Sequence, residues 1–415
     1  MTITQAVCQR AKDAAPDVAL LSSGTKDAAL HDMAMALESS IGALIEANAE
    51  DVRRAEASGT SRTLIDRLTL TEARVTAMAD GLRAVAAQPD PVGEVLEGWR
   101  RPNGLLIEKV RVPLGVVAVI YEARPNVTAD VAGLCLKSGN ACVLRGSSVA
   151  ISSNIAIAEI LRESATGAGV PKDAISLIEE TGRDSAVELM KAKGLVDLLI
   201  PRGGKDLVRS IEANAEVPYL IDGDGNCHVY VDASADLEMA TNIAVNAKTQ
   251  RPSVCNAAET LLVHQDIADE WLPTVLRELS AKGVEIRGDE RVIGIMPEAT
   301  PATEQDWGTE YLDLILAVKV VDSLSGAIAH INRWGTSNAE AIVTKDISSA
   351  RRFVTEVDSG SLFVNSSTRF SDGGEFGYGV EIGISTQKLH ARGPMGLKEL
   401  TSAKYIVWGN GQIRG

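Results

Sequence analysis

A cysteine in a short polar segment is the residue of this sequence best placed for covalent chemistry. Cys255 lies in the segment 250–256, which contains Pro252 and precedes a strand-like stretch at 259–263. A thiolate on such a loop can attack a carbonyl carbon, while backbone N–H groups freed by the turn stabilise the oxyanion that forms. The alternative is a small buried hydrophobe, because free cysteines are among the most buried residue types.

The composition favours a large α/β protein and argues against nucleic acid as a partner. The chain has 415 residues, enough for two or three domains, and its 45% hydrophobic and 4% aromatic residues suit helices packed on aliphatic strands. The 41 basic and 56 acidic residues leave a net charge of −15, which repels a phosphate backbone. An anionic substrate therefore needs a local cluster of positive groups.

The cysteines and the apolar runs indicate a reducing compartment. The five cysteines are odd in number and scattered, without a CxxC pair or a nearby histidine cluster, so we expect neither a disulfide framework nor a metal site. The amino terminus has no apolar signal region, and no stretch approaches the roughly 20 apolar residues of a membrane span. We therefore expect a cytoplasmic protein without a membrane partner.

The elements that must position Cys255 begin with a helical region over residues 1–90. One apolar stripe at three- and four-residue spacing runs through Leu30, Met33, Leu37, Ile41, Leu44 and Ile45. Asn48, with Asp51 three positions later, predicts a helix start, and Thr71 predicts another.

Two series of aliphatic strands alternating with helices follow. The first series has predicted strands at 114–121, 141–145, 174–178 and 195–200. The second has predicted strands at 259–263, 315–321, 341–344 and 362–364, with helices around Trp271 and over 326–332. Alternation of this kind predicts mostly parallel, doubly wound sheets in two α/β domains.

Two segments fit neither series. The segment 98–112 has β-favouring residues on both sides of Pro102, Asn103 and Gly104, which predicts a hairpin. The stretch 404–413 is strand-like up to Trp408. Isolated ribbons are marginal unless they pair, so we interpret the two as an oligomerisation arm. The alternative is a surface flap of the same chain.

The motifs of the first strand series resemble those of the aldehyde dehydrogenase superfamily. The matching segments are 113–117, 124–126, 137–140 and 143–148. More narrowly, the segments 121–126, 250–256 and 390–397 resemble the γ-glutamyl phosphate reductase family, and the similarity covers nearly the whole chain. The resemblance implies an aldehyde dehydrogenase-like α/β fold. Its parts would be an NADP-binding domain (1–97 and 113–225), a catalytic domain (226–385) and a β-ribbon oligomerisation arm (98–112 and 386–415).

The resemblance also implies an activity, the NADPH-dependent reduction of L-glutamyl 5-phosphate to L-glutamate 5-semialdehyde and phosphate, the second step of proline biosynthesis from glutamate. Cys255 would form a thioester, and Asn126 would donate to the oxyanion; the alternative for Asn126 is a helix N-cap. Hydrolytic aldehyde dehydrogenases carry a glutamate that activates water, and here the shorter Asp222 stands nearest that position. A hydrolytic NAD(P)-dependent aldehyde dehydrogenase remains the alternative activity.

The sequence lacks the GxGxxG motif of many dinucleotide-binding proteins. Instead, the segment 201–205 follows a predicted strand and opens a helix whose N–H groups would face a pyrophosphate. Arg145 stands where the superfamily has a lysine on the adenosine ribose, and Ser148 stands where NAD-preferring members have a glutamate, so the resemblance implies NADP. Glu310 matches the acid that holds the nicotinamide ribose; its alternative is an exposed surface carboxylate. The full set of expected cofactor-binding residues is Arg145, Ser147, Ser148, Thr181, Gly182, Arg202, Gly203, Gly204, Lys205 and Glu310.

An amino acid that carries an acyl phosphate needs positive and hydroxyl groups near the thiol. The expected substrate-binding residues are Arg124, Arg251, Ser366, Ser367 and Arg369. Which arginine would take the phosphate and which the α-carboxylate stays open. The expected macromolecular partners are further copies of the chain, in a homodimer or homotetramer, and a glutamate 5-kinase that passes on its unstable product.

Overall fold

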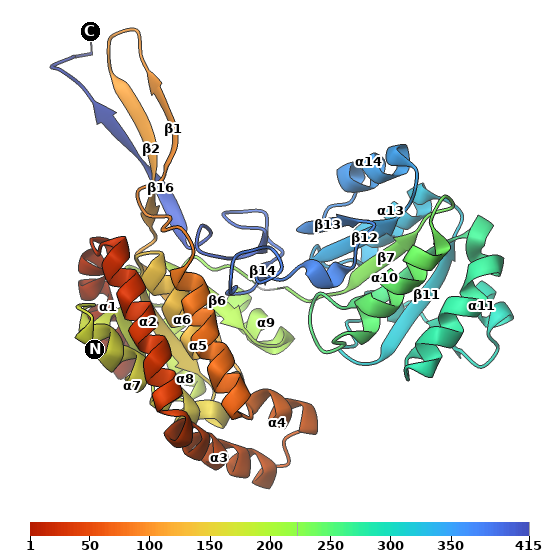
Figure 1. Ribbon diagram of the computed structural model, residues 1–415, viewed down its shortest axis with the longest axis horizontal. Helices are drawn as coiled ribbons and strands as arrows, with labels where there is room; N and C mark the ends of the chain where they lie inside the picture. The colour runs from red at the N-terminus through yellow and green to blue at the C-terminus, as the bar shows by residue number, and fades with distance from the viewer. Residues whose placement is uncertain (222, 415) are drawn as a thin grey trace. The chain divides into compact units, whose positions relative to one another are not determined.

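The computed structural model describes residues 1–221 and 223–414 (Figure 1). It divides into two compact units. Unit 1 comprises Met1–Ile221, Gly377–Gly383 and Met395–Gly415, and unit 2 comprises Asp222–Phe376 and Ile384–Pro394.

Unit 1 begins with the expected helical region. Its helices are α1 (Ile3–Ala19), α2 (Ser23–Ser39), α3 (Ile41–Ala57), α4 (Arg62–Leu68) and α5 (Glu72–Ala86). The apolar stripe through Leu30 and Leu44 is divided at Ser40, which ends α2 and begins α3. The predicted helix start at Thr71 is confirmed, because its side chain accepts the N–H of Arg74 at 3.2 Å.

The predicted helix start at Asn48 is wrong, because Asn48 and Asp51 lie in the middle of α3 and are buried. Their side chains act on another part of the chain. The Asp51 carboxylate accepts the N–H groups of Ser152 and Ser153, at 3.1 and 2.8 Å, in the first turn of α7 (Ile151–Gly167). Asp51 therefore caps α7, which begins about a hundred positions later in the sequence.

The sheet of unit 1 is parallel, in the order β5-β4-β3-β6. Its strands are β3 (Val116–Tyr121), β4 (Ala141–Gly146), β5 (Ile175–Leu177) and β6 (Leu198–Arg202), which confirms the first predicted series. The helices that connect these strands are α6 (Asn126–Lys137), α7 and α8 (Arg183–Met190), and α9 (Lys205–Asn214) follows β6. Every residue of β3 and β4 is buried, as expected for a sheet covered on both faces.

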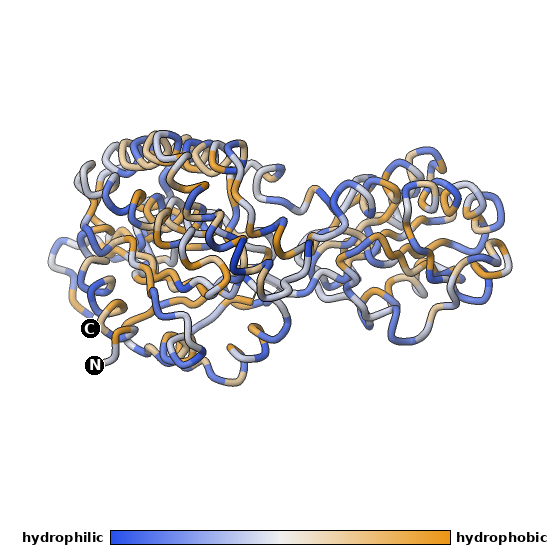
Figure 2. Tube along the Cα trace, turned by 90° about the horizontal axis from the view of Figure 1, so that it is seen from below, coloured by the Kyte–Doolittle hydropathy of each residue, from blue (hydrophilic) through white to orange (hydrophobic). Residues whose placement is uncertain are grey.

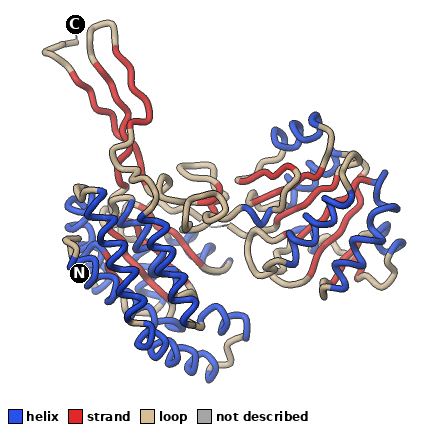
Figure 3. The backbone as a smooth tube through the Cα atoms, viewed as in Figure 1, coloured by secondary structure: helices blue, strands red, loops and turns tan. Residues whose placement is uncertain are grey.

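The two predicted ribbons pair with each other. The strands β1 (Val95–Arg100), β2 (Leu106–Pro113) and β16 (Thr401–Trp408) form an antiparallel sheet in the order β1-β2-β16. This sheet, here called the arm, extends away from the helices of unit 1 (Figure 3). It carries exposed aromatic residues, with Trp99 and Tyr405 edge to face at 6.3 Å between ring centroids.

Unit 2 is built on a parallel sheet whose described strands follow the order β10-β9-β11-β8-β7-β12-β13. The strands are β7 (Cys227–Val231), β8 (Ala258–His264), β9 (Glu285–Gly288), β10 (Thr300–Pro301), β11 (Ile315–Val321), β12 (Ala339–Val343) and β13 (Ser361–Val364). The helices are α10 (Leu237–Thr249), α11 (Gln265–Ala281), α12 (Glu290–Ile295), α13 (Leu324–Trp334) and α14 (Ile347–Glu356). The second predicted series is confirmed, and β7, β9 and β10 are strands that the sequence pattern did not predict.

The central strands of both units are apolar, and the polar residues lie mainly on the surrounding helices and loops (Figure 2). A short antiparallel pair, β14 (Ile384–Ser385) and β15 (Gly393–Pro394), completes unit 2. Within the described ranges, no helix has the length and apolar character that crossing a membrane requires.

Asp51→Ala should lower the free energy of unfolding by about 2 to 3 kcal/mol, because the first N–H groups of α7 would be left buried without an acceptor. Chemical denaturation followed by circular dichroism measures the change. The matched control is Glu50→Ala on the same helix, where an exposed ion pair with Arg54 at 3.6 Å is lost. That loss should cost less than about 1 kcal/mol. Equal destabilisation by the two changes would contradict the capping role.

Candidate active site

Cys255 lies on the loop between α10 and β8. Contacts with Cys227 and Gly225 fix the backbone of this loop. The thiol of Cys227 donates to the carbonyl oxygen of Cys255 at 3.2 Å. Gly225 packs so closely that a Cβ there would lie 1.6 Å from the same oxygen, so only glycine fits. A turn closes the loop, with the Ala257 N–H on the Val254 carbonyl at 3.1 Å. Cys255 itself is half-buried, whereas the other four cysteines are buried.

Asn256 ties the cysteine loop to the segment that was predicted to hold substrate. Its side-chain amide donates to the carbonyl of Ser371 at 2.8 Å, and its own carbonyl accepts the hydroxyl of Thr368 at 2.8 Å. Asn256 is 3% exposed, so these bonds are shielded from water. The segment 366–371 therefore lies beside the cysteine loop.

Arg369 brings a positive charge to the same place. Its Nε donates to the side chain of Gln250 at 2.9 Å. Burial lowers the pKa of the Arg369 guanidinium, Asp372 and the Cys255 thiol oppose that shift, and the nearby charge of Arg251 adds to it. Two cationic side chains near the thiol attract an anionic ligand.

The remaining substrate-binding predictions are distributed over both units. The buried hydroxyl of Ser367 accepts the N–H of Arg369 at 3.3 Å, and Ser366 is half-buried beside it. Arg124, in contrast, belongs to unit 1, where it precedes α6 and is half-buried. Unit 2 thus brings Cys255, Arg251 and the residues of segment 366–371 together.

Glu310 belongs to unit 2 and lies in the loop 309–314 that leads into β11. Its Oε1 accepts the N–H of Gly225 at 2.7 Å, and Gly225 packs on the carbonyl of Cys255. The carboxylate is half-buried, so it differs from the exposed surface group that was the alternative. Asp222, the residue nearest the position of the hydrolytic glutamate, lies outside the described residues.

The predicted cofactor residues of unit 1 gather at the carboxyl ends of the parallel strands. Tyr121, Gly146 and Arg202 are in register there, at the ends of β3, β4 and β6. The loops or helix starts that follow the strands carry Ser147, Ser148, Thr181, Gly182, Gly203, Gly204 and Lys205. Ligands of open α/β sheets bind outside this edge.

Arg145 fixes the loop that follows β5. Its Nη2 donates to the carbonyls of Thr181 and Gly182, each at 2.7 Å. Arg145 is 8% exposed and burial lowers its pKa, while its buried Nε has no hydrogen-bond partner among the residues described. An anion bound beside this guanidinium would satisfy Nε and offset the effect of burial.

The Gly203–Gly204 turn at the start of α9 is in contact with an acid that the sequence reasoning missed. The Gly204 N–H donates to Oε2 of Glu122 at 3.1 Å, and a Cβ at Gly203 would lie 2.7 Å from the Glu122 carboxyl group. Glu122 lies within the segment 121–126 that carried the family resemblance, which was the available signal. In this structure its carboxylate lies where the helix N-terminus was expected to meet a pyrophosphate.

Asn126 is the first residue of α6 and is exposed at the same edge of the sheet. Its amide donates to Oδ2 of Asp130 at 2.9 Å. Burial raises the pKa of Asp130 to about 6, while the Asn126 hydrogen bond and the charge of Arg202 act in the opposite direction. An amide has two N–H groups, so the bond to Asp130 orients Asn126 and leaves a second donor for an oxyanion.

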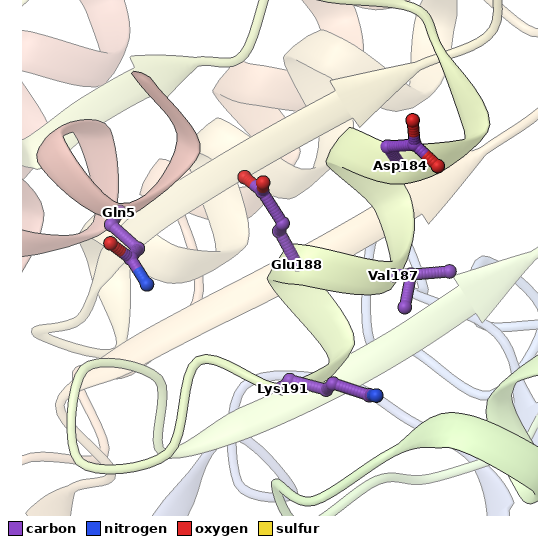
Figure 4. Close-up of a pocket in the computed structure, with 5 residues that line it drawn as sticks. All are labelled: Gln5, Asp184, Val187, Glu188 and Lys191. Atoms are coloured by element: carbon purple, nitrogen blue, oxygen red, sulfur yellow. The ribbon is translucent and has the colours of Figure 1, made fainter. Parts of the chain in front are cut away.

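One pocket of unit 1 lies apart from the expected site residues. A pocket of about 410 Å³ between α1 and α8 is lined by Gln5, Asp184, Val187, Glu188 and Lys191 (Figure 4). It contains no cysteine, and none of its residues belongs to the expected site. Throughout residues 1–221 and 223–414, no group of three or more His, Cys, Asp or Glu side chains could hold a metal ion.

Comparison with known sequences gives consistent matches. The model of the aldehyde dehydrogenase family matches residues 2–293. A γ-glutamyl phosphate reductase of Moorella thermoacetica is 58% identical over 98% of this chain and 97% of the relative. Another, from Caldanaerobacter subterraneus subsp. tengcongensis, is 56% identical over 98% of both chains.

Solved structures agree with this assignment. A crystal structure of γ-glutamyl phosphate reductase from Thermotoga maritima matches with a TM-score of 0.97 and 45% identity, over 100% of both chains. An acetylating aldehyde dehydrogenase from Geobacillus thermoglucosidasius, at 20% identity and a TM-score of 0.71 over 99% of this chain and 97% of that one, shares the fold. The expected aldehyde dehydrogenase-like α/β fold is thereby confirmed. The chain belongs to the aldehyde dehydrogenase family and, within it, to the γ-glutamyl phosphate reductases.

Proposed function

We propose that this protein reduces L-glutamyl 5-phosphate to L-glutamate 5-semialdehyde with NADPH and releases phosphate, the second step of proline biosynthesis from glutamate. The observation that carries the proposal is the half-buried Cys255 on a fixed loop beside Arg369, in a chain 56–58% identical to γ-glutamyl phosphate reductases. A nucleophile with adjacent cations suits an acyl phosphate, which offers an electrophilic carbon and an anionic leaving group.

The chemistry begins at Cys255. The thiolate sulfur attacks the carbonyl carbon of the acyl phosphate, and phosphate leaves with the electron pair of the broken C–O bond, so that a thioester remains. Arg369 and Arg251 compensate the negative charge of phosphate as it leaves, or that of the α-carboxylate. Arg124, Ser366 and Ser367 complete the proposed substrate set, with the division between the two anionic groups left open.

The residues of both units fit a nicotinamide cofactor, which membership in the family implies. One supporting observation is that the predicted residues of unit 1 follow strands at the carboxyl edge of a parallel sheet. The other is the buried Arg145, whose Nε has no hydrogen-bond partner among the described residues. When bound, NADPH supplies hydride to the thioester carbon. In our proposal Arg145 and the loops that follow β4, β5 and β6 hold the adenosine half, and Glu310 holds the nicotinamide ribose.

Negative charge develops on the carbonyl oxygen during both additions. We assign its stabilisation to the Asn126 amide and the backbone N–H of Cys255, each worth about 3 to 4 kcal/mol when aimed at the oxyanion. Asp130 keeps one N–H of Asn126 occupied and thereby sets the direction of the other. After hydride addition the C–S bond breaks, the aldehyde leaves and the thiol is regenerated.

The arm provides a surface for assembly. Its exposed Trp99, Tyr405, Val407 and Trp408 would be costly on an isolated ribbon, so we propose that the arm joins copies of the chain into a homodimer or homotetramer.

We also propose a glutamate 5-kinase as the supplier of the labile acyl phosphate. The free state of all five cysteines supports the expected cytoplasmic location.

Oxidation of glutamate 5-semialdehyde should depend on phosphate, because phosphate resolves the thioester in the reverse direction. The measurement is NADP reduction followed by absorbance, with and without phosphate. Cys255→Ser should fold as the wild type and lose nearly all turnover, since a neutral hydroxyl is a far poorer nucleophile than a thiolate. Phosphate-independent turnover that produces glutamate would instead identify a hydrolytic aldehyde dehydrogenase.

Asn126→Ala should lower kcat by about a hundredfold to a thousandfold if the amide serves the oxyanion. The control is Thr71→Ala, which removes a helix cap from the same unit at the start of α5. Steady-state kinetics and melting temperature are compared for the two variants. A change in Asn126→Ala confined to melting temperature, as expected of the control, would reduce Asn126 to a residue that supports α6.

Arg145→Ala should weaken NADPH more than NADH, because only NADPH loses a charge-assisted contact with its 2′-phosphate. Adding Ser148→Glu should place an acid near that phosphate and offer NADH a ribose partner. Together the changes should shift the NADPH to NADH ratio of kcat/KM by at least about tenfold. Equal losses for both cofactors would show that Arg145 only supports the Thr181–Gly182 turn, and Arg183 or Arg202 would become the candidates.

A further inference from the structure

A buried ion pair closes the base of the cysteine loop. Lys248, in the last turn of α10, precedes Cys255, and Glu259, on β8, follows it. The Nζ of Lys248 lies 2.5 Å from Oε2 of Glu259, and both side chains are 0% exposed. The pair therefore joins the two chain segments that enter and leave the loop.

Stability alone gives little reason for this pair. Burial raises the pKa of Glu259 to about 7 and lowers the pKa of Lys248, and the opposite charge of the partner acts against each shift. Breaking such a pair is strongly destabilising, but replacing both partners by apolar residues of similar volume is often neutral or stabilising. A further hydrogen-bond partner of Lys248 or Glu259 would explain why a charged side chain is needed at this position.

The second oxygen of Glu259 supplies that partner. Its Oε1 accepts the backbone N–H of Leu312 at 3.1 Å. Leu312 has a φ of 54°, a left-handed conformation that is strained for a non-glycine residue. The carboxylate thus holds the loop 309–314 in a shape that its own sequence disfavours.

A second anchor holds Tyr311, the residue that follows Glu310. The hydroxyl of Tyr311 donates to Oδ1 of Asp306 at 2.8 Å, and Arg287 donates to the same oxygen at 2.7 Å. The Glu310 carboxylate accepts the N–H of Gly225, whose Cα packs against the carbonyl of the reactive cysteine. Glu310 is therefore tied to the cysteine loop both through Gly225 and, by way of Leu312, through the buried pair.

We propose that Lys248 and Glu259 are positioning residues that couple the Cys255 loop to the Glu310 loop. Neither touches the reacting atoms. They keep the Cys255 thiol and the Glu310 carboxylate at a fixed distance from each other. The thiol can then attack the carbonyl carbon of the substrate while Glu310 holds the nicotinamide ribose near that carbon. The inference rests on the proposed roles of Cys255 and Glu310 and adds two residues to that mechanism.

Lys248→Met and Glu259→Gln test the proposal against a matched control. The control is Lys26→Met in unit 1, which breaks another ion pair of a buried lysine, with Asp90 at 2.8 Å and the lysine side chain 1% exposed. Lys248→Met and Glu259→Gln should lower kcat by about tenfold to a hundredfold, the scale expected for a reactive group displaced by about 1 Å. Lys26→Met should lower the melting temperature and leave kcat unchanged. Equal kcat losses in all three variants would overturn the proposal.

A double-mutant cycle tests the path through Glu310. If Glu259 acts by placing Glu310, Glu259→Gln should add little to the rise in the KM for NADPH once Glu310→Gln is present. Independent, multiplicative effects would overturn the coupling. The apolar variant Lys248→Met/Glu259→Leu covers the case in which a single change prevents folding: it should melt no lower than the wild type and still have a reduced kcat. Full activity of that variant would also overturn the proposal.

Alkylation of Cys255 by iodoacetamide separates this inference from the proposed function. Among the five cysteines only Cys255 is not buried, so alkylation of the other four should be slow and contribute little to the measured rate. The rate constant should change severalfold in Lys248→Met and not in Lys26→Met, whatever the natural substrate is. A wild type without phosphate-dependent turnover would overturn the proposed function while this comparison still stood. An unchanged alkylation rate with unchanged kcat would overturn the positioning role.

Discussion

The carbonyl of Cys255 is held by the thiol of Cys227 and by the bare Cα of Gly225, and the chemistry of unit 2 depends on that contact. A loop without repetitive structure loses a nucleophile's orientation unless its backbone is fixed from outside. Here the fixing groups come from the start of β7 and the segment before it. Because Gly225 also donates to Glu310, the same contact sets the distance between the nucleophile loop and the acid assigned to the cofactor.

The candidate site residues include positive side chains, although the chain as a whole is negatively charged. A protein with a net charge of −15 offers an acyl phosphate no general attraction, so binding must come from a few placed cations. Arg369 and Arg251 lie near Cys255 in unit 2, and Arg145 lies at the carboxyl edge of the sheet in unit 1. Each unit thus has its own positive groups, one set for the proposed substrate and one for the proposed cofactor.

The parts of the fold that follow from burial could be predicted from the sequence. β3 and β4 are fully buried aliphatic runs, and β11 was predicted with the bounds that the structure shows. β7 was missed because it carries His228, which is buried against Glu340 with 3.0 Å between Nδ1 and Oε2. A polar residue satisfied by the neighbouring strand β12, which lies far away in the sequence, interrupts the apolar pattern without interrupting the strand.

Cys255 was predicted from its residue type and its loop, Arg369 from its place beside a motif of the expected site, and Glu310 from the family resemblance. The supporting groups could not be predicted. Asn48 and Asp51 predicted a helix start, whereas Asp51 caps α7. No sequence pattern pointed to the pair of Lys248 and Glu259, which are fully buried. Their partners are set by tertiary contacts, which no local spacing records.

The central claim is that the reaction passes through a covalent bond to Cys255, and mass spectrometry of the quenched enzyme tests it most directly. The enzyme is incubated with glutamate 5-semialdehyde and NADP without phosphate, quenched in acid and digested. The account predicts a glutamyl group on the peptide that contains Cys255, and its loss when phosphate is added before the quench. Turnover that proceeds with Cys255 unmodified, or a glutamyl group on another residue, would contradict the account.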